Sequence, residues 1–169
     1  MAEDRFANIA TLTLAESAAG TLTFQELRTG VGIEPDRKSA NAMAIDEIDY
    51  FVGVTALAQM TASTDRIDYA ITVSNAVTDL TDFSDRRILH SGFLLRTDLG
   101  TAASSWVHRM PLVHQFFPPL ITADKSLYLG VVGTGLASAI LMKARIYHRI
   151  VEISQGEFIE LAEVFRLVG

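Results

Sequence analysis

Four histidines are the residues of this chain best suited to chemistry, because imidazole binds metal ions and exchanges protons near neutral pH. They are His90, His108, His114 and His148. None of their spacings matches an H-x-H or H-E-x-x-H metal motif. His148 lies among apolar residues of an expected strand, where a histidine is more often buried than a metal ligand. We therefore predict no metal site at these residues.

Two groups of carboxylates could also carry a function. Asp79, Asp82 and Asp85 fall in one loop and could offer oxygens to calcium, but their spacing is not that of an EF-hand. Aspartates that stabilise turns are the alternative that we favour. Glu47 and Asp49 are two positions apart on an expected strand and so share a face. No partner base or oxyanion donor accompanies them, and we predict no acid–base site.

The glycines of the segment GVVGTG complete the search for chemistry. Gly130, Gly133 and Gly135 match neither G-x-G-x-x-G nor a P-loop, and no helix pattern follows them at once. We expect all three to be turn glycines. No nucleophile elbow surrounds any serine. The sequence therefore predicts no catalytic residue and no cofactor.

The composition limits the classes of partner. The 169 residues carry a net charge of −6, no cysteine and no run of Lys or Arg. A chain without a basic cluster lacks the electrostatic surface that binds phosphate backbones, so direct nucleic-acid binding is not expected. Apolar residues make up 49% of the chain, which indicates a folded protein with a sizeable core. We expect one domain over residues 1–169.

Alternating apolar residues predict an all-β fold. Residues 66–73 alternate most clearly, which indicates a half-buried antiparallel strand. The uncharged stretch 126–142 is too short and too rich in glycine to span a membrane, and we expect two buried strands there. Further strands are expected at residues 20–30, 88–95, 111–117 (ended by Pro118 and Pro119) and 141–153. About eight strands in all indicate a sandwich or a jelly roll.

The C-terminal residues 154–169 are predicted to form a short helix. Ser154 and Glu157 fit a capping box, S-x-x-E. Phe158, Leu161, Ala162 and Phe165 then follow helical spacing and predict one buried face. Further apolar residues lie outside this stripe. Either a neighbouring subunit covers them or the helix is simply buried at the edge of the domain.

Three segments of the chain resemble the small single-jelly-roll capsid proteins of tailless icosahedral viruses, particularly those whose shell encloses a lipid membrane. They are GTLTFQELRTG at residues 20–30, FFPPLITADKSLYLGV at 116–131, and EFIELAEVF at 157–165. The likeness is one of layout across most of the chain, without a diagnostic motif. It implies a single jelly roll of two packed antiparallel sheets with a short C-terminal helix, after an N-terminal segment at residues 1–14.

The resemblance also implies a function. Such proteins form pentamers or hexamers that build an icosahedral shell around the genome, so the chain would belong to the virion, assembled in the host cytoplasm. A second capsid protein or an internal membrane near the shell would suit a chain that has no basic arm. Aromatic residues dominate subunit contacts, and we expect interface positions at Trp106, Phe116, Phe117, Phe158 and Phe165.

Two other classes of protein remain open on sequence alone. A carbohydrate-binding β-sandwich module would present aromatic rings on a sheet face or a loop rim, and one Trp with four Tyr is a small supply. A cupin-like metalloenzyme would need a histidine pair that the chain lacks.

Overall fold

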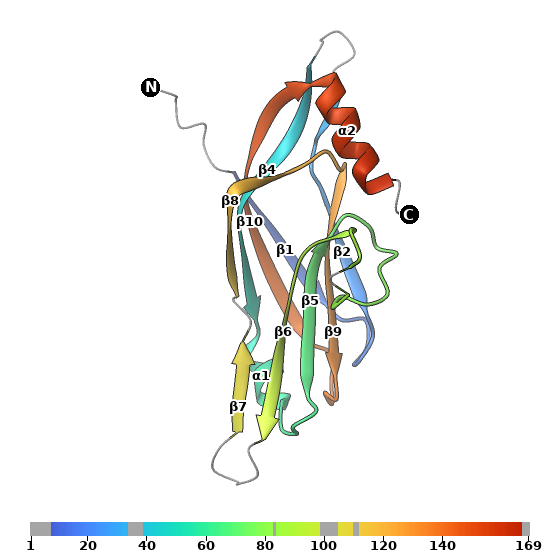
Figure 1. The fold of residues 1–169 in the computed structure, drawn as a ribbon. Coiled ribbons are helices and arrows are strands. Elements are labelled where there is room, and N and C mark those ends of the chain that lie inside the picture. The colour runs from blue at the N-terminus through green and yellow to red at the C-terminus, as the bar shows by residue number, and fades with distance from the viewer. Residues whose placement is uncertain (1–7, 34–38, 83, 99–104, 110–111, 167–169) are drawn as a thin grey trace.

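Two β-sheets and two short helices make up the computed structural model, which describes residues 8–33, 39–82, 84–98, 105–109 and 112–166 (Figure 1). All strand pairs are antiparallel. The strands are β1 (Asn8–Ala15), β2 (Thr23–Arg28), β3 (Gly32–Ile33), β4 (Ser39–Val52), β5 (Arg66–Thr72), β6 (Ile88–Asp98), β7 (Ser105–Arg109), β8 (Val113–Thr122), β9 (Ser126–Thr134) and β10 (Leu141–Ser154). The helices are α1 (Val54–Gln59) and α2 (Gln155–Arg166).

The strand order is that of a jelly roll. One sheet has the order β1-β10-β4, with β8 and the short β3 both pairing with β4; the other has the order β2-β9-β5-β6-β7. Without β3 and β7, four strands ordered β1-β10-β4-β8 face four strands ordered β2-β9-β5-β6. Two interlocked Greek keys over eight strands produce this order. The predicted fold class, an all-β single jelly roll with a short C-terminal helix, is confirmed.

The main core fills the space between the two sheets. Alternation along each strand brings one side chain in two to the inside, and in β10 Met142, Ala144 and Ile146 are buried while Lys143 and Arg145 are exposed. The largest contributions from the other strands are Ile45, Ile48, Tyr50, Ile67, Tyr69, Ile71, Leu127, Leu129 and Val131. Of the two buried strands predicted within residues 126–142, one is present as β9; residues 135–140 form the loop to β10, which begins only at Leu141. None of the helices among the described residues is long and apolar enough to cross a membrane.

The strand β5 differs from its prediction because both of its faces are buried. Asp68, Ala70 and Thr72 were expected to face solvent, yet each is less than a tenth exposed. The reason is the long connection between β5 and β6, whose Val77 and Leu80 pack on Ala70 in a small separate cluster. The prediction that this strand is half-buried was therefore wrong.

The strand β8 also differs, because it continues through Pro118 and Pro119 to Thr122. β8 is an edge strand of its sheet, and its pairing with β4 is interrupted between Gln115 and Leu120. Prolines are tolerated at an edge or a bulge, where no ladder hydrogen bond needs their missing N–H group. The prediction that the strand stops at Pro118 was wrong.

Only one of the three predicted turn glycines lies in a turn. Gly135 has a φ of 78°, a conformation that favours glycine. Gly130 and Gly133 lie inside β9. A Cβ atom at either would stand less than 3 Å from the side chain of Phe24 or Leu136 respectively, so close packing accounts for these two glycines.

The segment at residues 1–14, to which the sequence assigned no element, contains most of β1, which pairs with β10 along its whole length.

Candidate functional site

The helix α2 begins with the capping box that the sequence predicts. The Ser154 backbone N–H donates to Glu157 Oε2 at 2.9 Å, and the Glu157 N–H donates to Ser154 Oγ at 3.2 Å. The hydrogen bond from the Ser154 backbone holds the pKa of the Glu157 carboxyl below its usual range. This capping box fixes the N-terminus of α2 at Ser154, and so determines which residues of the helix face the sheet.

A second, small core lies beneath α2. Phe158 is buried against Ala40 of β4 and Ala123, and the side chains that pack around them are Ile153, Leu161 and Ala162. Ala40 pairs with Ile153 in the sheet and stands at odd spacing from Met43, which belongs to the main core. α2 packs beside the ends of β4 and β10 through a cluster that is separate from the main core. The predicted buried stripe is confirmed for Phe158, Leu161 and Ala162.

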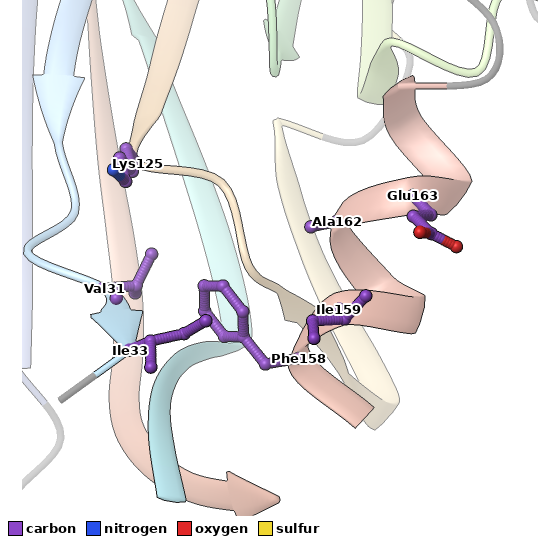
Figure 2. Close-up of a pocket in the computed structure, with 8 residues that line it drawn as sticks. Val31, Ile33, Lys125, Phe158, Ile159, Ala162 and Glu163 are labelled. Carbon is purple, nitrogen blue, oxygen red and sulfur yellow. The ribbon is translucent and has the colours of Figure 1, made fainter. Parts of the chain in front are cut away.

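An apolar groove runs along each side of α2. One groove of about 450 Å³ lies between the helix and the segment around β3, and its residues are Val31, Gly32, Ile33, Lys125, Phe158, Ile159, Ala162 and Glu163. Figure 2 shows Phe158 extending from α2 toward Ile33, with Lys125 across the groove from the helix. The other groove, of about 350 Å³, includes Ile121, Ile153 and Leu161 with two glutamates of the helix.

The outward side of α2 combines one apolar residue with acidic ones. Ile159 is 47% exposed. Glu160 and Glu163 are exposed beside it, and neither makes an ion pair among the described residues. We call Ile159, Glu160 and Glu163 the helix surface.

A second exposed apolar surface lies at the opposite end of the same sheet. Phe51 of β4, Val113 of β8 and Leu141 of β10 are each more than two-fifths exposed. Lys143 pairs with Phe51 in the register, and the Arg145 guanidinium lies 5.0 Å from the centre of the Phe51 ring. These five residues, Phe51, Val113, Leu141, Lys143 and Arg145, are called the sheet surface below.

The two carboxylates next to the sheet surface are less accessible than its cations. Glu47 accepts a hydrogen bond from Gln115 Nε2 at 2.7 Å. Asp49 lies opposite Arg145 in the register but is only 9% exposed, and its Oδ1 has no hydrogen-bond partner among the described residues. The predicted shared face of Glu47 and Asp49 follows from the register, and it is the outer face of this sheet.

The five predicted interface residues lie in different environments. Phe158 is buried within its own chain, and Phe116 is partly buried against the main core. Phe117 is fully exposed on β8. Trp106 lies on β7 and Phe165 on α2, but their side chains are outside the described residues. The interface role of these five residues stays a prediction.

A histidine pair between the sheets was not predicted. The rings of His90 on β6 and His114 on β8 have centres 4.4 Å apart, and the Tyr50 hydroxyl is hydrogen-bonded to His90 Nδ1 at 2.9 Å. Burial, with a smaller contribution from His114, lowers the pKa of His90 to about 4. Only the meeting of the edges of two sheets brings these positions together, so no spacing in the sequence could reveal the pair.

The three loop aspartates stabilise turns. Asp79 Oδ1 accepts hydrogen bonds from the Thr81 N–H and hydroxyl, and Asp82 repeats this arrangement with Ser84. Asp85 does the same with the backbone and side chain of Arg87. The favoured alternative, turn aspartates, is confirmed. Among the described residues, no group of three or more His, Asp or Glu could hold a metal ion.

Comparisons with known proteins add a structural likeness. No protein-family model and no curated protein matches the sequence. The structure is similar to apo New Jersey polyomavirus VP1, with a TM-score of 0.45 and 7% sequence identity, over 88% of this chain and 100% of that chain. At that score the likeness supports no argument about function. The class of fold, a single jelly roll, rests on the strand order of this chain.

Proposed function

We propose that this protein is a structural protein that associates with copies of itself, a capsid protein of the single-jelly-roll kind. In this role it forms part of a viral shell that protects a genome, and it needs no catalytic group. The shell is built from pentamers or hexamers, with a second capsid protein or an internal membrane as further components.

The observation that carries the proposal is a pair of exposed surfaces, one on α2 and one at the far end of the sheet that contains β4 and β10. A fold does not decide a function by itself, so the jelly roll only agrees with the proposal. Exposed apolar residues gathered with charged ones are typical of protein interaction sites. The sheet surface has this character, with three exposed apolar side chains beside two cations, and the helix surface presents one exposed apolar side chain beside two carboxylates. Both belong to secondary structure, which holds a contact in fixed geometry.

The missing basic segment agrees with a shell that does not touch its genome directly. The sequence has no run of Lys or Arg, and capsid proteins that neutralise phosphates need such runs. A membrane or a second protein between the shell and the genome would remove that need.

The test is the size of the purified protein in solution. Light scattering after size exclusion, over a range of protein concentrations and at low salt, should show oligomers, with rings or shells in negative-stain images. A monomer under all these conditions would contradict self-association. Glycan binding at the exposed Phe117 would then be the alternative to measure, since an exposed aromatic ring is what a carbohydrate module presents.

A further inference from the structure

The helix surface and the sheet surface of one molecule cannot meet each other. Ile153, which lies under α2, and Lys143, in the sheet surface, are ten positions apart on the continuous strand β10. At about 3.3 Å per residue, these two positions are roughly 33 Å apart along the strand. α2 turns back from the end of β10 (Figure 1), but its 12 residues span only about 18 Å, which is too short to reach the sheet surface. Any contact between them must therefore join two molecules.

The two surfaces are complementary in charge. The helix surface offers Glu160 and Glu163 beside the exposed Ile159, and the sheet surface offers Lys143 and Arg145 beside exposed apolar side chains. Lys143 makes no ion pair among the described residues, and the contact that Arg145 makes is with the Phe51 ring. The cations are thus free to meet carboxylates of another molecule.

The grooves beside α2 give the contact its shape. They flank the helix on both sides, and the exposed Ile159 lines the groove that faces β3. The exposed Phe51 and Leu141 side chains of a neighbouring molecule can pack against Ile159 and the apolar residues of this groove.

We propose that α2 of one copy docks on the sheet surface of the next copy, with Ile159 against Phe51 and Leu141, and with Glu160 and Glu163 facing Lys143 and Arg145. This contact specifies the self-association in the proposed function and rests on it. Two different surfaces meet, so the contact is heterologous, and repeated copies form either a closed ring or an open chain. A two-fold dimer with identical surfaces facing each other is not the product.

Charge reversal tests the contact without disturbing the core, because all four charged residues are exposed. A helix variant carries E160K and E163K, and a sheet variant carries K143E and R145E. Each variant alone places like charges across the contact, and we expect its association to weaken by about a hundredfold or more. A control variant, R28E with R86E, has the same change in net charge as the sheet variant and alters exposed residues outside both surfaces. It should associate like the unmodified protein.

Mixing the two variants is the decisive measurement. The helix of the sheet variant still fits the unmodified sheet of the helix variant, and the two reversed surfaces now attract each other. The mixture should therefore form oligomers that neither variant forms alone, as measured by analytical ultracentrifugation. Circular dichroism and thermal melting of each variant check that it remains folded.

The outcomes separate this contact from the proposed function. If the unmodified protein is monomeric, both the function and the contact are overturned. If it forms oligomers that survive both charge reversals, self-association stands and the proposed contact is wrong. If each variant loses its oligomers but their mixture does not recover them, the head-to-tail pairing is wrong. Recovery in the mixture, with the control unaffected, supports it.

Discussion

Acidification should destabilise the protein through His90. The ring is partly buried beside His114, and its pKa falls from the ordinary 6.5 to about 4 on folding. The folded state therefore disfavours the charged ring. Between pH 6.5 and 4 the unfolded chain holds a proton at His90 that the folded protein lacks, so the free energy of unfolding must rise with pH in that window. The contribution of His90 is fully present above pH 6.5 and is lost as the pH falls toward 4.

The size of this destabilisation follows from the difference between the pKa of His90 in the unfolded and folded states. Two and a half pKa units correspond to about 3 kcal/mol. Solvent reaches part of the ring, so we expect about 1–2 kcal/mol of the free energy of unfolding to depend on this group.

The assay is urea unfolding at a series of pH values from 4 to 8 for the unmodified protein and for His90→Gln. Glutamine keeps an oxygen that can accept a hydrogen bond from the Tyr50 hydroxyl, but it does not titrate. Because glutamine does not titrate, any other effect of the substitution on the free energy of unfolding is the same at every pH. The difference between the two proteins should therefore change only below pH 6.5, in the direction that favours the variant at low pH.

A direct measurement accompanies the urea series. NMR of the histidine ring protons should show His90 remaining neutral down to about pH 5. Titration of His90 near pH 6.5, or a difference between the two proteins that is constant from pH 8 to 4, would refute the reasoning.

Three further substitutions test the packing and the buried polar groups. In Gly92→Ala, the new Cβ would stand 2.7 Å from two ring carbons and the hydroxyl oxygen of the buried Tyr69, so urea unfolding should show a loss of about 1–3 kcal/mol; unchanged stability would mean that the Tyr69 side chain can move aside. In Tyr69→Phe, removal of a buried hydroxyl without a hydrogen-bond partner should leave stability unchanged or raise it by up to about 1 kcal/mol, and a clear loss would reveal a missing partner. In Glu16→Gln, one of the two carboxylate oxygens that accept the Gly133 and Ile140 N–H groups becomes an amide donor. Its melting temperature should fall, with a loss of about 1–3 kcal/mol, and the loop between β9 and β10 should become more sensitive to proteases; resistance equal to that of the unmodified protein would contradict this role.

The sequence correctly predicts those parts of the fold whose structure is determined by residues close together in the sequence. The capping box at Ser154 and Glu157 depends on residues three positions apart, and it forms as expected. The alternation in β10 likewise places Met142 inside and Lys143 outside. In both places, every residue that determines the structure lies within a few positions of the others.

The predictions fail where residues that are distant in the sequence determine the local structure. Ala70 is buried on the outer face of β5 because Val77 and Leu80 of a long loop return to cover it. Pro118 is accepted in β8 because that strand lies at a sheet edge, which is a property of the topology. His90 and His114 meet across two sheets. The sheet surface, too, exists only because Phe51, Leu141 and Arg145 come together through the pairing of β4 with β10.

The position of β10 in its sheet determines the order in which the strands of that sheet can pair during folding. β10 is the last strand along the chain, yet it lies between β1 and β4 and pairs with both. During synthesis, β1 is therefore made first among these strands, and its partner β10 is made last. Pairings between such distant segments make folding slow and leave strand edges open in the meantime. Because α2 follows β10 directly, α2 packs on the sheet only after the strand that completes that sheet has been made. A nascent chain thus acquires the helix surface at the same stage as the facing edges of β1 and β4 become paired with β10.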